Sequence, residues 1–524
     1  MELVKKNIHM DRTKAEAVSQ ITLEDDLNIP EQKPDVDSIC FQKGSVWMEE
    51  IKPMTDAVIL RGRLKFQMLY HTKEAGSSLV LLESGIPFEE KLNMQGVSAA
   101  DTVTAQGEVE DLSIGLINSR KLNIQSVITL TAKTEELYDE EIPIALPMLS
   151  EEENVEYCKT PIRLAEIVIC KNDIFRIREE VSLPGGYPNF FQILWSSVTL
   201  GDMEWKVTSE KIILQGEVHI FVLYEGEGED HPIRTFESVL PFGGSLECHG
   251  CREGMIADIG YEMEEQEHTQ FLSIRPDMDG EERNLGLEIV LNISMKLYEE
   301  DNVEMITDIY GVSGNVETVS KQADLRRLLA RVNGKTKVTD HIRMKNTDGI
   351  LQLLHSEGSI AVEEESAVEN GILIKGSLLL NTLYITGNDE APYGNRQVQI
   401  PFQYTLEVPG MQKTDIRRIH AKVEQLQTTM LDGEEMDVKA VLEFSTTVFR
   451  IIPVELIQEI RISEQDSSVL AALPGMAVYV VRPGDNLWSI GRKYYVPTDN
   501  LRKINHLEKD ELMPGQKLLI VRGS

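Results

Sequence analysis

The sequence predicts a mostly β protein, in which three repeated antiparallel β domains precede a small strand–helix–helix–strand module. Two observations predict this arrangement. Alternation of apolar and polar residues recurs in three long segments that share one spacing of glycine, tyrosine and Pro-Phe. The last 49 residues instead combine short strand-like runs with helical spacing and turn residues.

The repeat is visible in three segments that align without gaps. They read AVILRGRLKFQMLY at 57–70, KIILQGEVHIFVLY at 211–224 and GILIKGSLLLNTLY at 371–384. In each segment a glycine stands eight residues before a tyrosine, and a Pro-Phe pair begins seventeen residues after that tyrosine. The three sets are Gly62, Tyr70 and Pro87-Phe88; Gly216, Tyr224 and Pro241-Phe242; and Gly376, Tyr384 and Pro401-Phe402. A spacing kept three times predicts three copies of one domain.

Each repeat segment alternates with period two, which predicts a long, half-buried strand. The glycine falls on the apolar face, where it indicates a bulge, a bend or a close approach of backbone. Further alternating runs follow in each copy, at 121–132, 285–298 and 436–449. Each copy is therefore predicted to be an antiparallel sandwich or twisted sheet with long loops.

The domain boundaries follow from these runs and from composition. Residues 323–332 have helical spacing and predict a connector between copies two and three, and the Ser- and Gly-containing stretch 465–475 predicts a linker. The predicted order is an N-terminal segment 1–30, β repeat 31–155, β repeat 165–318, helical connector 319–333, β repeat 340–457, linker 458–475 and terminal module 476–524.

The terminal module can be read residue by residue. A β-branched and aromatic run at 479–481 ends at Pro483-Gly484 and predicts a short strand and a tight turn. Asp485 stands where a helix N-cap belongs, and Leu487, Ile490 and Tyr494 form one apolar helix face. Pro497 ends that helix, and Thr498 is a plausible cap for a second one. A Pro-Gly turn at 514–515 then leads into a closing strand.

These residues resemble the LysM domain. The matching positions are Pro483, Gly484, Asp485, Leu487, Trp488, Ile490, Asn505, Pro514, Gly515 and Gln516, whereas Asn486 and Tyr495 depart from the family pattern. The resemblance implies a shallow groove for N-acetylglucosamine-type glycans between the loop before the first helix and the loop after the second. Candidate groove residues are Gly484, Asp485, Asn486, Leu487, Trp488, Lys503, Asn505, Leu507, Met513, Pro514 and Gly515. Leu487 and Trp488 also fit a small hydrophobic core instead.

Charge and hydropathy limit the partners. The chain carries 52 basic and 87 acidic residues, a net charge of −35. This charge argues against nucleic acid as a partner, because phosphate binding needs Lys and Arg. Residues 476–524 hold eight basic and five acidic residues, so a module of +3 ends a body of −38. The N-terminus lacks the apolar run of a secretory signal, and no segment is apolar enough for a membrane span, so a cytoplasmic protein without membrane insertion is expected.

Chemistry-bearing motifs are few. Neither a G-x-S-x-G nucleophile elbow nor an H-E-x-x-H zinc helix occurs. Cys248-His249-Gly250-Cys251 has the spacing of metal ligands, but no second pair with recognisable spacing completes a site. We therefore expect no catalytic residue, no metal and no cofactor, and a protein that is not an enzyme.

Three such β domains followed by a LysM resemble the SPOCS-domain proteins of endospore-forming bacteria. This resemblance implies a mother-cell protein at the forespore surface that helps to assemble the spore coat, with its LysM bound to the coat-scaffold ATPase, stage IV sporulation protein A. Such a role agrees with a LysM that stays in the cytoplasm. A protein that binds peptidoglycan or N-acetylglucosamine in the spore envelope remains the alternative.

Overall fold

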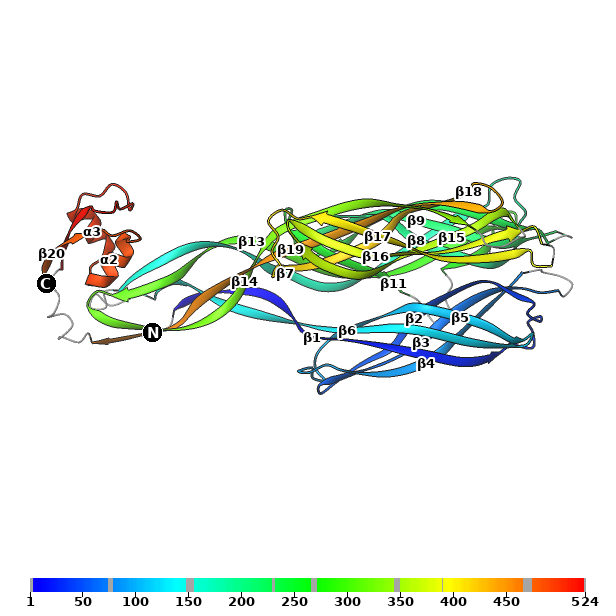
Figure 1. The fold of residues 1–524 in the computed structure, drawn as a ribbon, viewed down its shortest axis with the longest axis horizontal. Coiled ribbons are helices and arrows are strands. Elements are labelled where there is room, and N and C mark those ends of the chain that lie inside the picture. The colour runs from blue at the N-terminus through cyan, green and yellow to red at the C-terminus, as the bar shows by residue number, and fades with distance from the viewer. Residues whose placement is uncertain are drawn as a thin grey trace.

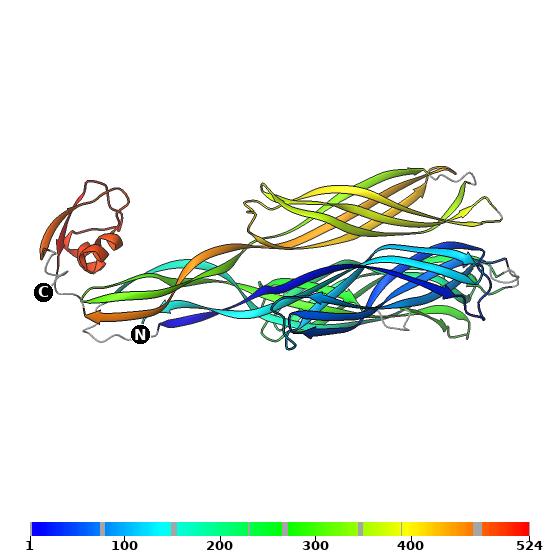
Figure 2. The same ribbon diagram turned by 60° about the horizontal axis from the view of Figure 1, so that its bottom comes forward.

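The computed structural model describes residues 3–522 except 74–78, 148–154, 229–230, 265–270, 344–348, 389 and 465–473. The molecule is long (Figures 1 and 2). Three β domains lie together at one end, paired strands run from them as twisted ribbons, and the terminal module lies at the other end. No helix among the described residues is long and apolar enough to cross a membrane.

The three domains share one topology of two packed sheets. The first domain pairs β1 (Val4–Asn28), β6 (Lys121–Ala145) and β5 (Val103–Asn118), and beside them β2 (Ser38–Met54), β3 (Ala57–His71) and β4 (Leu79–Asn93). The third domain repeats this order with β14 (Gly314–Arg343), β19 (Glu435–Glu464) and β18 (Ile416–Met430), and with β15 (Ile350–Val368), β16 (Gly371–Thr386) and β17 (Tyr393–Glu407). The antiparallel β prediction is confirmed.

The second domain has the same plan with one strand divided. One of its sheets holds β8 (Phe190–Thr208), β9 (Lys211–Gly226) and β10 (Ile233–Glu247). The other holds β7 (Val155–Ser182), β13 (Glu282–Gly311), β11 (Ile256–Met263) and β12 (Leu272–Pro276). Each domain encloses a hydrophobic core of its own, to which both sheets contribute.

The repeat motif marks a packing unit inside each domain. In the first domain Gly62 of the middle strand stands opposite Phe88 of the next strand, and a Cβ on Gly62 would lie 2.8 Å from that ring. The pairs Gly216–Phe242 and Gly376–Phe402 are equivalent. The motif therefore exists because the phenylalanine covers a strand position that only glycine leaves open.

The motif tyrosine anchors a loop. The Tyr70 hydroxyl donates to the carbonyl of Pro34 at 3.0 Å, and Tyr224 donates to the carbonyl of Pro188 at 3.1 Å. Both rings are fully buried. The tyrosine thus holds the connection between the first and second strands against the end of the core.

The outer strand pairs extend past the domains as three ribbons, β1–β6, β7–β13 and β14–β19, which together form a stalk (Figures 1 and 2). Their shared cores include Met10, Met305 and Leu456, and farther out Ile309 and Ile460. Every ribbon contains two register shifts, one near the body and one farther out. The shifts near the body are at Thr13/Ala15 in β1–β6, Leu297/Tyr298 in β7–β13 and Leu328/Ala330 in β14–β19, and the outer shifts are at Val4/Lys5, Ile306/Asp308 and Val319/Ser320 in the same order. Since bulges increase strand twist, these shifts favour the coiling of the ribbons.

The predicted helical connector at 319–333 is wrong, because these residues belong to strand β14. Each register shift moves the apolar residues to the other phase of the period-two pattern. Before the shift at Leu328/Ala330 the buried residues are Ala323 and Leu325, and after it the core-facing residues are Ala330 and Val332. Leu328 packs in a separate cluster, so the apolar residues of this strand recur at the spacing of a helix. Pairing with β19 overrides the local pattern.

Other predicted segments lie inside the β structure. The N-terminal segment 1–30 contains β1, which pairs along its length with β6. Residues 458–464 of the predicted linker belong to β19, and 465–473 lie outside the described residues.

An ion network, here called the junction cluster, joins the three domains where the stalk begins. It consists of Asp11 and Glu135 of the first domain, Asp258 and Lys296 of the second, and Arg326 and Arg418 of the third. Asp11 is 2% exposed and accepts from Lys296 at 2.7 Å, Arg326 at 2.9 Å and Arg418 at 2.8 Å. Burial alone would raise the pKa of Asp11, but Lys296 and Arg418 outweigh it and lower that pKa to about 2.

Candidate functional site

The terminal module has the predicted order of strand, helix, helix and strand. Its elements are β20 (Met476–Val480), α2 (Leu487–Tyr494), α3 (Thr498–Ile504) and β21 (Lys517–Val521). The two strands pair antiparallel. All four elements contribute to one small core that includes Leu487, Leu501 and Leu518.

The cap of helix α2 is Asn486 and not Asp485, which corrects the sequence prediction. The Asn486 side chain accepts from the Ser489 amide at 2.7 Å, and the Asn486 amide donates to the Ser489 hydroxyl at 3.1 Å. Asp485 instead accepts from the Arg482 amide and from the Tyr479 hydroxyl, both at 2.8 Å. These bonds lower the pKa of Asp485. Asp485 therefore fixes the turn, and Asn486 begins the helix as a capping box.

Two further polar residues of the module have structural contacts. Thr498 is the first residue of α3 and does not cap it, since Pro497 occupies the cap position and makes no side-chain bond. The Asn505 side chain donates to the carbonyls of Leu501 and Leu519 and accepts from the Leu519 amide at 2.6 Å. Asn505 therefore ties the end of α3 to β21.

The structure brings the two predicted groove loops together. The Val481 amide donates to the Gln516 carbonyl at 2.9 Å, and the Gly515 amide donates to the Val481 carbonyl at 2.8 Å. The exposed candidates are Gly484, Asn486, Lys503, Met513, Pro514 and Gly515. Asp485, Trp488, Asn505 and Leu507 are half-buried, and Leu487 is buried in the core. The exposed subset is therefore the accessible part of the predicted groove.

Family models match both parts of the chain. The model described as "SipL, SPOCS domain" matches residues 35–117, 191–269 and 349–431, and the LysM domain model matches residues 479–521. The chain has the domain content of a SipL-like protein. Its three SPOCS segments span the inner strands of the three β domains, whereas the outer strands that build the stalk lie largely outside them.

Two curated proteins of Bacillus subtilis (strain 168) share a short region with the chain. The putative sporulation-specific glycosylase YdhD is 47% identical over 45 residues, which are 9% of this chain and 11% of that protein. The uncharacterized protein YkzQ is 40% identical over 43 residues, which are 8% of this chain and 57% of that protein. The chain thus spans less than two thirds of either relative. No solved structure matches it significantly.

Trp488 belongs neither to the LysM core nor to the open groove rim. Its indole Nε1–H donates to Asp308 Oδ2 of β13 at 2.8 Å, and its ring meets Tyr310 edge-on with centroids 4.8 Å apart. Arg492 of the same helix binds the same Asp308 oxygen at 2.6 Å. The LysM domain therefore docks on the β7–β13 ribbon through α2. No local sequence signal could have shown Asp308 and Tyr310 to be partners of a helix that lies so far along the chain.

The Cys248–Cys251 pair is part of the SPOCS core. Both thiols are fully buried, and the Cys251 amide donates to the Cys248 carbonyl in a tight turn. Burial and the neighbouring thiol raise the pKa of Cys248 to about 11. Equivalent turns in the other two domains place Met94 and Val97, and Val408 and Met411, in the corresponding cores. The described residues contain no cluster of three or more metal-binding side chains.

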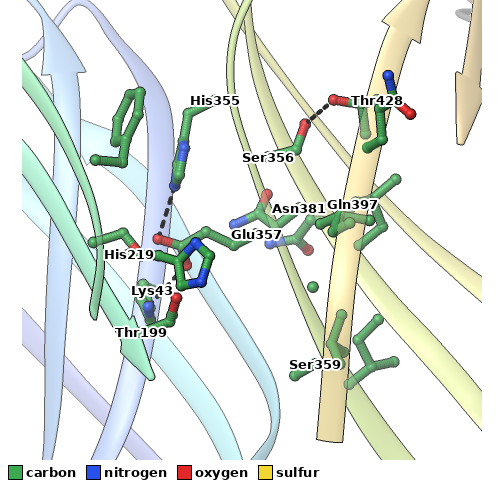
Figure 3. Close-up of a pocket in the computed structure, with 18 of the residues that line it drawn as sticks. Lys43, Thr199, His219, His355, Ser356, Glu357, Ser359, Asn381, Gln397 and Thr428 are labelled. Atoms are coloured by element: carbon green, nitrogen blue, oxygen red, sulfur yellow. Dashed lines mark hydrogen bonds and ion pairs between the residues drawn. The ribbon is translucent and has the colours of Figure 1, made fainter. Parts of the chain in front are cut away.

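A cavity of about 1410 Å³ lies between the three SPOCS domains. At its wall Glu357 of the third domain binds Lys43 of the first at 2.8 Å and His355 at 3.2 Å (Figure 3). Trp195 of the second domain donates to the same carboxylate at 3.4 Å. Burial alone would raise the pKa of Glu357, but Lys43 and His355 hold it far below its ordinary range. Glu357 thus joins all three domains.

Proposed function

We propose that this chain is a non-enzymatic adaptor of spore-coat assembly that binds a scaffold protein through its LysM domain. The observation that carries the proposal is the separation of two binding modules in one molecule. The three SPOCS domains lie at one end, and the LysM domain lies at the far end of the stalk (Figure 1). A molecule so built can contact two partners at once.

The assignment to sporulation rests on the domain content. The SPOCS segments match the SipL model, and one curated relative of the chain is named as sporulation-specific. LysM and SPOCS domains are binding domains, which supports a role in assembly.

We infer that the partner is the coat-scaffold ATPase, stage IV sporulation protein A, met at the forespore surface. The SPOCS–LysM resemblance supports this partner, and so does the charge of the module. Residues 476–524 carry +3, so an acidic surface on the partner would be attracted to them. The exposed Lys503 and Met513 offer one cationic and one apolar contact at the groove rim.

A glycan ligand is the second candidate, because the LysM match and the two adjacent groove loops favour it. Peptidoglycan or another N-acetylglucosamine polymer would then bind between the loops at 482–486 and 505–516.

A comparison of two immobilised ligands separates the candidates. The full chain, Lys503→Glu and Met513→Glu are tested for retention on the scaffold ATPase and on chitin. We expect retention on the scaffold alone, at least tenfold weaker for each rim variant, which corresponds to about 1.4 kcal/mol. Both substitutions are at exposed positions, so folding should be unchanged. Retention on chitin with no affinity for the scaffold would instead identify a glycan as the ligand of the LysM domain.

A further inference from the structure

Besides the predicted groove, the LysM domain has a surface on the side of α2 that faces the stalk, and residues of the stalk cover this surface. It is formed by Trp488, Gly491 and Arg492 of α2, by Val496 of the following turn and by Thr498 at the start of α3. Of the predicted groove candidates Trp488 alone takes part in it, and none of the exposed ones does. The surface is therefore distinct from the groove that the family resemblance implies.

The ribbon presents a specific pair of side chains to this surface. Asp308 and Tyr310 stand two residues apart on β13 and so point to one face of the strand, while Ile309 between them faces the stalk core. A register shift between Ile306 and Asp308 directly precedes the pair. Bulges of this kind re-aim the side chains that follow them, here toward the LysM domain.

Carboxylate recognition at this surface uses two donors. Asp308 Oδ2 accepts from the Trp488 indole at 2.8 Å and from the Arg492 guanidinium at 2.6 Å. A neutral amide in place of the carboxylate would lose the ionic component of both bonds. The site thus prefers an acidic residue.

Aromatic recognition completes the contact. The Tyr310 ring packs edge-on against Trp488, and its hydroxyl donates to the Val496 carbonyl at 2.9 Å. Gly491 leaves room for that hydroxyl, since a Cβ there would lie 2.6 Å from it. Tyr310 is 4% exposed. On the neighbouring strand Glu156, directly opposite Tyr310, accepts from Thr498 at 3.1 Å.

We propose that the α2 surface of this LysM domain is a recognition site for an extended Asp-x-Tyr segment, and that β13 occupies it as an internal ligand. The contact is a latch that fixes the direction of the groove relative to the stalk. A segment of another protein that presents the same carboxylate and tyrosine in a strand would compete for the surface. The proposal goes beyond the adaptor function and does not depend on the identity of the scaffold partner.

NMR relaxation of the LysM amides in the full chain tests the latch. In the 59.1 kDa protein a docked LysM relaxes with the whole molecule, and a released one gives sharp lines. We expect slow tumbling in the wild type and in Glu304→Gln, a control carboxylate on the exposed part of β13. We expect released LysM signals in Asp308→Asn, Tyr310→Phe and Trp488→Phe. Sharp LysM lines in the wild type, or no release in Asp308→Asn, would overturn the latch.

A peptide of residues 304–312 tests the recognition chemistry in trans. It is added at millimolar concentration, because tethering supplies an effective concentration of about that order in cis. We expect it to shift the Trp488 indole signal in the Asp308→Asn chain at least tenfold more strongly than in the wild type. A peptide that carries Asp308→Asn itself should have no effect. Equal shifts in both chains, or a shift in neither, would refute the recognition site.

Discussion

Replacement of Asp11 by asparagine should loosen the contact between all three domains. Asp11 is 2% exposed and is bound by Lys296, Arg326 and Arg418 from the other two domains. Its pKa is lowered from the ordinary 3.8 to about 2, which corresponds to about 2 kcal/mol of folding free energy at neutral pH. Removal of one partner from a buried ion network costs about 3 to 5 kcal/mol in other proteins. We therefore expect Asp11→Asn to lower the free energy of unfolding by about 2 to 4 kcal/mol.

The pH dependence follows from the direction of the pKa change. Because the folded-state pKa of Asp11 lies below the unfolded value, its stabilisation is present above about pH 4 and is lost as the pH falls toward 2. Thermal unfolding followed from pH 7 to pH 2 should show this loss in the wild type and a smaller one in Asp11→Asn. At neutral pH the first transition of the variant should fall by about 5 to 10 °C.

An exposed carboxylate on the same ribbon provides the control. Asp139 binds His9 at 2.6 Å with both side chains open to solvent, so Asp139→Asn should change stability by less than about 0.5 kcal/mol. If Asp11→Asn behaves like this control, the junction cluster does not hold the domains together and the reasoning fails.

Three further sets of substitutions test the glycine packing, the tie inside the LysM domain and the contact between the SPOCS domains. Gly62→Ala and Gly376→Ala should each lower the stability of their domain to urea by about 1 to 3 kcal/mol, because the new Cβ would lie 2.3 and 2.2 Å from a backbone carbonyl oxygen. Gly216→Ala should cost less, since the atom nearest to its Cβ is the movable Met203 sulfur at 2.7 Å. An equal loss of stability in all three variants would contradict the packing argument. Asn505→Ala should lower the stability of the LysM domain by about 1 to 3 kcal/mol, since it leaves the Leu519 amide without its partner. Thermal melting by circular dichroism compares this variant with Asn500→Ala, a substitution at an exposed position. Indistinguishable melting would show that the bond between Asn505 and β21 is unimportant. Glu357→Gln should weaken the contact between the SPOCS domains by about 1 to 2 kcal/mol, because it removes the charge that Lys43 and His355 bind while the half-exposed Lys43 ammonium stays partly solvated. Hydrogen exchange in β2 and β15 measures this against the exposed Glu364→Gln, and unchanged exchange would argue against the three-domain tie.

The parts of the fold that could be predicted from sequence are those with local signals. Period-two alternation around Gly62, Gly216 and Gly376 is set by one buried sheet face, so it identified the repeated strands. The LysM elements were predictable because turn and helix signals follow each other within 49 residues. The cap of α2 was misassigned by one position, since both Asp485 and Asn486 can cap and only the turn geometry decides between them.

The remaining features depend on contacts far apart in sequence. The bulges at Val319/Ser320 and Leu328/Ala330 shift the apolar phase of β14, which made that strand resemble a helix. The junction cluster collects Asp11, Lys296 and Arg418 from three domains, and no single segment shows them to be neighbours. Trp488 likewise contacts Asp308, which is distant in the sequence. The LysM pattern alone therefore could not predict that Trp488 lies outside the groove.

The central claim is that the LysM domain joins this chain to a coat-scaffold protein, and one affinity measurement tests it most directly. Binding of purified stage IV sporulation protein A is compared for the full chain and for a chain that ends at residue 475, with circular dichroism used to verify that the β domains stay folded. The account predicts tight binding by the full chain and at least a hundredfold loss on truncation. Undiminished binding by the folded truncated chain would contradict it.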